Sequence, residues 1–175
     1  MEHLVITIQA PQPIDIWQKI TKMASDFDCH ITHIQGQRIA GENALTALIC
    51  GNWNTIAKLE TELQQLKTNE DILVTLKRSE PLADQIQLLP YIVQVISLEH
   101  ISTLYHICKF FNENSIAIEN LQFDNYISTA TNAEMFSLNV SLGIPSITNI
   151  GELRERFMIF CDDLNIDGII EPEKR

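Results

Sequence analysis

The residue types that could bind a metal gather at one place in the sequence, at Cys29, His30 and His33. Thiolate and imidazole groups are ligands that Zn²⁺ prefers, and a zinc site needs several of them in one small volume. On a regular strand, His30 and His33 would point to opposite faces because their separation is odd. The sequence therefore favours a structural role for these side chains over a metal site.

Sequence motifs of the common catalytic sites are missing from the chain, which contains no GxSxG, HExxH, P-loop or GxGxxG pattern. Carboxylate pairs occur at Asp162-Asp163 and at Glu152 with Glu155, but both pairs lie where a solvated helix face is predicted. Paired carboxylates alone do not make an acid–base site. The sequence therefore predicts no enzyme and no cofactor.

The segments that join the first strand to the first helix, residues 9–15 and 98–102 in the two halves, are where a small ligand is expected. A helix N-terminus offers free N–H groups and the positive end of the helix dipole, which suit a carboxylate. With one residue of the following strand, His30, the candidate ligand-binding residues are Ala10, Pro11, Gln12, Pro13, Ile14, Asp15, Glu99, His100, Ile101 and Ser102.

The elements that must position these residues occur twice along the chain, in the order strand, helix, strand, strand, helix, strand. Apolar residues at helical spacing mark 14–27, 56–66, 101–111 and 150–164. Extended patterns mark 4–8, 31–39, 44–50, 72–76, 92–96, 116–127, 136–142 and 166–170. The repeat of roughly 87 residues is too long for a solenoid and indicates a duplicated domain.

The repeated pattern predicts an α+β protein of two tandem ferredoxin-like βαββαβ modules, residues 1–78 and 91–175, joined by a linker at 79–90 that contains Pro81 and Pro90. Right-handed crossovers place the first and third strands in the middle of a four-stranded antiparallel sheet, with both helices on one face. The second strand then lies at an edge, where it could pair with another sheet and form a homodimer.

The charge of the chain is −11, and it is unevenly divided. Residues 1–78 contain 7 basic and 9 acidic residues, whereas residues 79–175 contain 5 basic and 14 acidic residues. This charge repels a phosphate backbone and excludes direct nucleic-acid binding, but it suits either a basic protein partner or a solvated surface. No apolar run is long enough to span a membrane and the start is unlike a signal peptide, so a cytoplasmic protein with four reduced cysteines is expected.

Several short segments resemble the glycine cleavage system transcriptional repressors, a family of tandem ACT-domain regulators. These segments are Leu4-Val5-Ile6-Thr7, Gly51-Asn52-Trp53-Asn54, Leu76-Lys77-Arg78, and Phe157 and Cys161 with Leu164-Asn165. The resemblance covers nearly the whole chain and implies a repressor without a DNA-binding domain. Such a protein would bind a DNA-binding activator of the glycine cleavage genes, and glycine or another small amino acid would relieve the repression.

The first loop departs from the pattern of that family, Asp-Arg-Pro-Gly, because Asp15 stands where the glycine is expected. A glycine lets a ligand approach the backbone closely, whereas the Asp15 carboxylate can itself cap the helix and repel a ligand carboxylate. We therefore expect Asp15 to weaken amino-acid binding in the first module. Asn52 is predicted to be a helix N-cap, and Trp53 beside it is interpreted as a packing anchor.

Two other functions remain open from the sequence. One is an amino-acid-sensing module that regulates a metabolic enzyme directly, and the other is an interaction protein that has lost ligand control. The protein recovered with the chain from a native lysate would separate them, since a DNA-binding activator and a metabolic enzyme are distinct outcomes.

Overall fold

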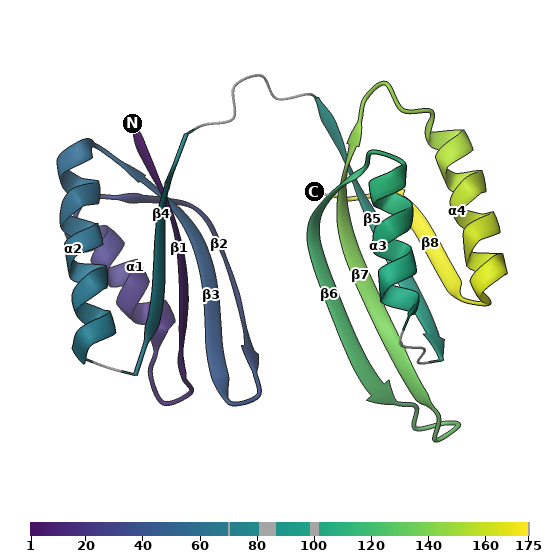
Figure 1. The fold of residues 1–175 in the computed structure, drawn as a ribbon, viewed down its shortest axis with the longest axis horizontal. Coiled ribbons are helices and arrows are strands. Elements are labelled where there is room, and N and C mark those ends of the chain that lie inside the picture. Colours follow the sequence, from purple (N-terminus) through teal and green to yellow (C-terminus); the bar gives the residue numbers. More distant parts are fainter. Residues whose placement is uncertain (70, 81–86, 99–101, 175) are drawn as a thin grey trace. The chain divides into compact units, whose positions relative to one another are not determined.

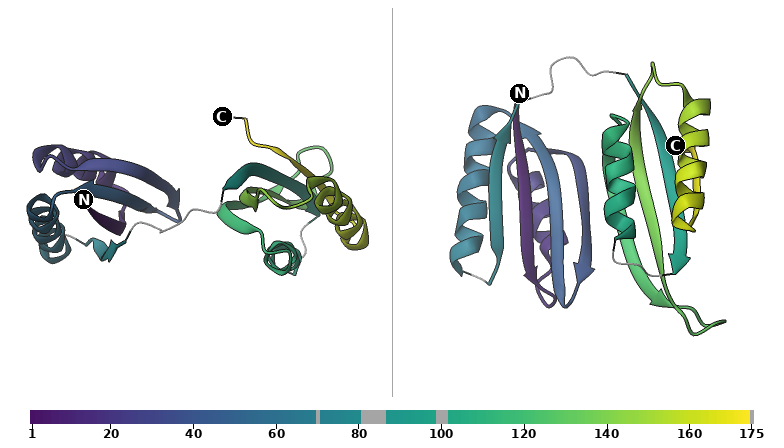
Figure 2. Two further views of the ribbon diagram at one scale, coloured as in Figure 1. Left: turned by 90° about the horizontal axis from the view of Figure 1, so that it is seen from above. Right: turned by 45° about the vertical axis from the view of Figure 1, so that its right-hand side comes forward.

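The computed structural model describes residues 1–69, 71–80, 87–98 and 102–174, and the chain divides into two compact units, Met1–Ala83 and Asp84–Arg175. Each unit consists of a four-stranded antiparallel sheet with two helices on one face (Figure 1). The helices lie on the same side of their own sheet when each unit is seen from above (Figure 2). The predicted repeated βαββαβ fold is therefore confirmed.

The first unit contains β1 (Glu2–Pro11), α1 (Ile16–Asp26), β2 (His30–Ile39), β3 (Glu42–Gly51), α2 (Trp53–Asn69) and β4 (Leu73–Ser79). Its strands are ordered β2-β3-β1-β4, so the first and third strands lie in the middle as the crossover rule predicts. The second unit contains β5 (Leu88–Leu98), α3 (Thr103–Glu113), β6 (Ala117–Ile127), β7 (Glu134–Pro145), α4 (Ile150–Leu164) and β8 (Asp167–Pro172). Its strand order, β6-β7-β5-β8, repeats that of the first sheet.

Alternating apolar residues on the central strands form the core of each unit. In β1 the side chains of Leu4, Ile6 and Ile8 are at most 1% exposed and face the two helices. In β7 every second residue from Phe136 to Ile144 is buried in the same way. Full burial stabilises each such side chain by roughly 1.5 to 3 kcal/mol, which explains why the strand period of two fixes the orientation of the sheet.

Some large apolar residues on the core-facing side of the helices are less buried than their helical spacing predicts. Ile20, Phe111 and Phe157 are fully buried as expected, but Trp17, Phe27, Leu104 and Phe160 are only partly buried at the rim of the cores. Two helices do not cover a twisted sheet of four strands completely, so residues on the outer sides of the helices retain contact with water.

Trp17 packs against a strand that has a glycine at the point of contact. A Cβ atom on Gly36 of β2 would lie 2.2 Å from Trp17 Cη2 and 2.4 Å from the Ala44 carbonyl oxygen. Any larger residue would therefore displace the indole ring from the sheet. This close approach connects α1 to β2 and holds the start of α1 at the edge of the sheet.

The segment between the two sheets is bounded by strand residues on both sides. Ser79 is the last residue of β4, and Leu88 is the first residue of β5, so the predicted linker at 79–90 overlaps both strands. Pro90 is accommodated in β5 because its backbone faces the end of β8, where its carbonyl accepts a hydrogen bond from Glu173 N at 3.0 Å. Only one hydrogen bond at the margin of the sheet is lost there.

Candidate functional site

The loop that joins β1 to α1 is held in place by a buried asparagine of β3. Asn43 is 1% exposed, and its amide donates hydrogen bonds to the carbonyl oxygens of Ile14 at 3.0 Å and Gln12 at 3.4 Å. Its own oxygen accepts a hydrogen bond from Arg38 Nε at 3.2 Å. The loop backbone is also bonded from Gln12 N to the Gly41 carbonyl. These contacts fix the loop that contains most of the candidate ligand residues of the first unit.

Asp15 occupies the N-terminus of α1, which confirms the expected capping. Its carboxylate accepts a hydrogen bond from Gln18 N at 3.0 Å, and its carbonyl accepts one from Lys19 N. The N–H group of Ile16 is directed to the Ile14 carbonyl. The end of the helix that would receive a ligand carboxylate therefore already holds a negative side chain.

His30 and His33 lie on the same face of the first sheet, contrary to the prediction from their spacing. His30 is opposite Cys50 and His33 is opposite Leu48, with a bulge between them that takes up Thr32 as an extra residue. Because the bulge adds one residue to β2, two side chains that are three residues apart point to the same face of the sheet. Both imidazoles are exposed, and within the described ranges no three His, Cys, Asp or Glu side chains are placed to hold a metal ion.

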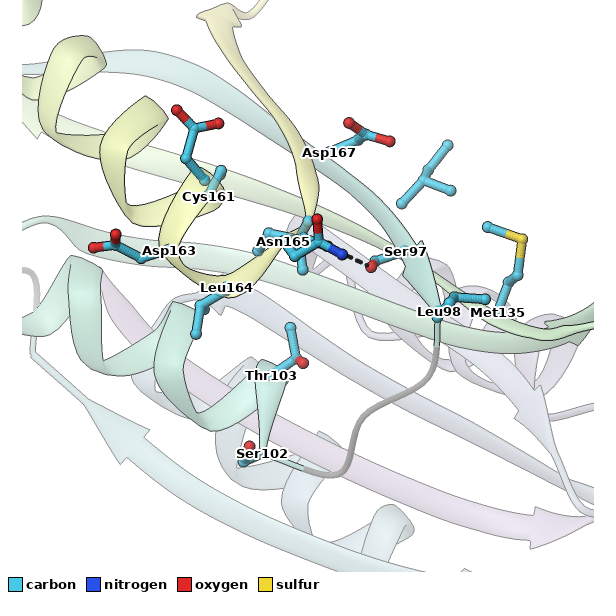
Figure 3. A pocket seen from close by; sticks show the side chains of 13 residues that line it. Ser97, Leu98, Ser102, Thr103, Met135, Cys161, Asp163, Leu164, Asn165 and Asp167 are labelled. Atoms are coloured by element: carbon cyan, nitrogen blue, oxygen red, sulfur yellow. Dashed lines mark hydrogen bonds between the residues drawn. The ribbon is translucent and has the colours of Figure 1, made fainter.

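In the second unit, the candidates Glu99, His100 and Ile101 lie outside the described residues, whereas Ser102 directly precedes α3 and lines a pocket. This pocket has a volume of about 780 Å³. It lies where α3 begins and α4 ends, and it also contacts β5, β7 and the start of β8 (Figure 3). Its apolar wall includes Leu98, Met135 and Leu164.

The two helix ends at the pocket have opposite polarity. α3 begins there without a side-chain cap from Ser102 and with no acidic residue in its first turn. α4 ends there with no basic residue in its last turn, and Asn165 closes it in the left-handed conformation at φ 53°. The positive end of one helix dipole and the negative end of another therefore lie at the same pocket.

Thr103 and a group of aspartates supply polar side chains to the pocket. Thr103 is a buried polar residue, 5% exposed, and its hydroxyl has no hydrogen-bond partner in the described part of the chain. Asp162, Asp163 and Asp167 surround the end of α4 at the opposite side. Sequence reasoning placed Asp162 and Asp163 on a solvated helix face and missed Thr103, because residues so far apart in sequence meet only in the folded unit.

The Cys161 thiol lines the pocket, and its pKa is raised first by burial and second by nearby negative charges. Burial, together with the negative charges of Asp162 and Asp167, raises the pKa of the Cys161 thiol to about 11. The pKa of the Cys108 thiol is raised too, but by burial alone. All four cysteines are free, so neither thiol is engaged in a disulfide.

We expect Cys161 to react slowly with iodoacetamide between pH 7 and 9, because a thiol with a pKa of about 11 is almost wholly protonated there. Replacing both Asp162 and Asp167 with asparagine removes two negative charges, which lowers the pKa and accelerates alkylation of Cys161 at fixed pH. Peptide mass spectrometry of a pH series measures each thiol separately. Cys108 is the internal control, since its rate should not change, and an unchanged Cys161 rate would contradict this account of the pocket.

Two segments that carry the family resemblance, Gly51-Asn52-Trp53-Asn54 and Leu76-Lys77-Arg78, form contacts within the first unit. Asn52 Oδ1 accepts a hydrogen bond from Thr55 N at 2.9 Å, which confirms it as the N-cap of α2. Trp53, however, is 64% exposed, so its interpretation as a packing anchor is wrong. Arg78 binds the Glu60 carboxylate through Nε at 2.9 Å and Nη2 at 2.7 Å, and this bidentate contact lowers the pKa of Glu60.

The described residues contain no helix that is both long and apolar enough to cross a membrane.

Comparisons with known proteins agree with the fold over the whole length of the chain. Residues 2–77 match the family model of the ACT domain. The chain is 21% identical over 168 residues to the glycine cleavage system transcriptional repressors of Escherichia coli and Shigella flexneri, covering 96% of this chain and 88% of each relative.

Solved structures share the fold of this chain over nearly its whole length. A crystal structure provisionally named as a glycine cleavage system transcriptional repressor superimposes with a TM-score of 0.75 at 25% identity, covering 99% of this chain and 98% of that one. An unknown protein from Galdieria sulphuraria superimposes with a TM-score of 0.77 at 9% identity over 99% of both chains, which shows the shared fold alone. The chain thus consists of two modules of the same βαββαβ fold, the first of which matches the ACT-domain model, and it is similar along its whole length to transcriptional repressors of the glycine cleavage system.

Proposed function

We propose that the protein is a cytoplasmic, non-enzymatic repressor of glycine cleavage genes that acts by binding a DNA-binding activator protein. The observation that supports this most directly is the similarity to repressors of that system across 96% of the chain, including both modules. The net charge of −11 supports action through a protein, since a chain of this charge is repelled by DNA.

The activator that controls the glycine cleavage genes provides the direct test. We expect the purified chain to bind this activator and to give no mobility shift with the operator DNA when the activator is absent. A shift produced by the chain alone would overturn the proposal. Co-purification with a metabolic enzyme, and no binding to the activator, would instead support direct regulation of an enzyme.

We further propose that a small amino acid controls this regulator by binding the pocket of the second unit rather than the loop of the first. An amino acid carries a carboxylate and an ammonium group, and the pocket offers the start of α3 to one and the aspartates at the end of α4 to the other. The Thr103 hydroxyl lies within the same pocket and can bind either group.

In the first unit the helix start is occupied by Asp15. Two unit charges about 4 Å apart repel by roughly 4 kcal/mol at an effective dielectric constant of 20. Solvent reduces this energy, but a remainder of about 1.4 kcal/mol is already a tenfold loss of affinity. Asp15 therefore disfavours an amino-acid carboxylate at this position.

Calorimetry with glycine and with serine distinguishes the two positions. Thr103→Val removes the buried hydroxyl at nearly constant volume, and we expect it to weaken binding roughly tenfold by the loss of one hydrogen bond. Asp15→Gly should leave that binding intact and add a second, weaker site in the first unit. The matched control is Thr61→Val on α2, which should bind as the unchanged chain does.

Each alternative outcome identifies a different error. Weaker binding by Asp15→Gly would mean that the Asp15 carboxylate holds the ammonium group of the ligand in the first unit. No effect of Thr103→Val would mean that the pocket of the second unit is not the amino-acid site. No heat with any amino acid would leave a regulator without ligand control.

Pairing of sheet edges is the route we propose for self-association. β2 lies at the edge of the first sheet, and nine of its ten residues are exposed. The backbone N–H and C=O groups along its outer edge can pair with the same strand of a second copy. A homodimer seen by light scattering and removed by a proline at Gln35 would support this pairing.

A further inference from the structure

The outer face of the second sheet, which faces away from α3 and α4, differs in charge from that of the first. β5, β6, β7 and β8 contain no Lys, Arg or His, and they carry five acidic residues, Glu119, Asp124, Glu134, Asp167 and Glu171. The strands of the first sheet carry only two acidic residues, Glu2 and Glu42, against Arg38, Lys77, Arg78 and three histidines. The strands of the second sheet therefore have a net charge of −5, whereas α3 and α4, with five acidic and three basic residues, have a net charge of −2.

Strand register places four of these five acidic residues on the outer face, which we call the acidic face. Asp167 is opposite Ile96, Glu171 is opposite Ile92, and Asp124 is opposite Ser137, all at positions that alternate with the buried core. Glu119 lies in a bulge, and its Oε1 would be 2.7 Å from a Cβ atom built on Gly143, so it also lies over this face.

Among the described residues, no Lys or Arg side chain forms an ion pair with an acidic group of this face. The ion pair in the described part of the second unit joins Lys109 to Glu113, both on α3. Asp124 accepts a hydrogen bond from Gln122 at 3.0 Å, which leaves its charge uncompensated. Four carboxylates on one sheet without neutralising charges produce a negative field that attracts cations.

Large apolar side chains lie among these carboxylates. Leu98 is 60% exposed, Ile169 is 50% exposed and Ile96 is 47% exposed, and all three alternate with core residues on β5 or β8. Tyr126 of β6 is opposite Met135 of β7, so the apolar surface extends across the sheet. The middle of the face is polar, since Gln94 of β5 donates a hydrogen bond to Asn139 of β7, and most of the apolar residues therefore form a band at one end of the sheet beside Asp124 and Asp167. Apolar side chains that adjoin charged ones are typical of a protein–protein interface.

We propose that the acidic face docks a protein surface whose apolar side chains are flanked by Lys and Arg. This deepens the partner binding proposed above by assigning its location and chemistry. The negative charge of the acidic face selects among possible binding partners, because it would repel nucleic acid and anionic membranes. A second copy presenting the same face would bring two sets of four carboxylates together, which disfavours self-pairing through this surface.

The test uses the full chain and a defined probe, an amphipathic peptide with a leucine face flanked by lysines. Nuclear magnetic resonance of the isotope-labelled chain should show shift changes on the strands of the second sheet and not on α3, α4 or the first unit. The same peptide with glutamate at each lysine position should not bind. Equal binding of both peptides, or changes centred elsewhere, would overturn the proposal.

Charge variants locate the electrostatic contribution. The triple variant Glu119→Gln, Asp124→Asn and Glu171→Gln should weaken binding of the lysine peptide roughly tenfold at low salt, since each exposed pair contributes modestly. Its matched control, Glu113→Gln, Glu152→Gln and Glu155→Gln, makes the same change in net charge on the helices. Equal weakening by the two variants would show that only the total charge matters, which would overturn the assignment to this face.

Apolar variants locate the hydrophobic contribution. Tyr126→Ser with Ile169→Ser should weaken peptide binding, whereas Met158→Ser with Ile147→Ser, at exposed positions off the sheet, should not. Because the probe is a synthetic peptide, these results do not depend on the identity of the activator. If the peptide binds the acidic face and the activator does not bind the chain, the proposed function fails while the docking surface stands.

Discussion

Replacing Phe157 with alanine is expected to lower the free energy of unfolding of the second unit by about 4 kcal/mol. Phe157 is 0% exposed, and its ring stacks on Phe111 at 5.6 Å and packs against Phe110 at 5.6 Å. It therefore connects α4 to α3 through the centre of the aromatic cluster.

The loss of stability in Phe157→Ala is large because the residues around Phe157 cannot move inward to fill the space of the missing ring. A Cβ atom on Gly168 of β8 would lie 3.1 Å from the Phe157 ring, so the ring fills the space left by a glycine. Removing the ring opens a cavity bounded by β8 and by other aromatic rings, which cannot all move inward without leaving their own contacts.

Urea denaturation measures this change in the second unit separately. The three tyrosines, Tyr91, Tyr105 and Tyr126, lie in the second unit, and both tryptophans, Trp17 and Trp53, lie in the first. The tyrosine signal should move to lower urea in Phe157→Ala. Met158→Ala, at the exposed neighbouring position, is the control and should shift it little, and equal shifts in the two variants would refute the cavity argument.

Replacing Asn43 with leucine is expected to destabilise the first unit by about 2 to 3 kcal/mol. Leucine has a similar volume but cannot donate hydrogen bonds, so the Gln12 and Ile14 carbonyl groups lose the amide that they share. Because Asn43 is 1% exposed, water cannot easily replace that amide.

A second substitution distinguishes the hydrogen bonds that the Asn43 amide donates from the one that its oxygen accepts. Asn43→Asp keeps the oxygen that accepts from Arg38 but replaces the amide donors with a carboxylate, which should also destabilise the loop. The tryptophan signal in urea reads the first unit, and Asn54→Leu at an exposed position of α2 is the control. If Asn43→Asp were as stable as the unchanged chain, the donated hydrogen bonds would not hold the loop.

Much of the fold is determined by local sequence patterns. Strict alternation in residues 136–142 can bury one side of β7 only as a strand, and the helical spacing of Ile16, Ile20 and Ala24 places all three on the buried side of α1. Crossover handedness then determines which strands are central. Capping by Asp15 and Asn52 was predictable for the same reason, since a cap bonds within its own first turn.

Features that depend on contacts between distant segments were decided only by the tertiary structure. The bulge that brings His33 to the face of His30 arises from pairing with β3, and the exposure of Trp53, the first residue of α2, depends on how that helix packs on the sheet. The pocket joins Thr103 to Asp167, which are separated by most of the second module. A sequence determines the period and capping of each element locally, but the neighbours of a side chain across the core depend on how whole elements pack, and that packing is a property of the folded chain.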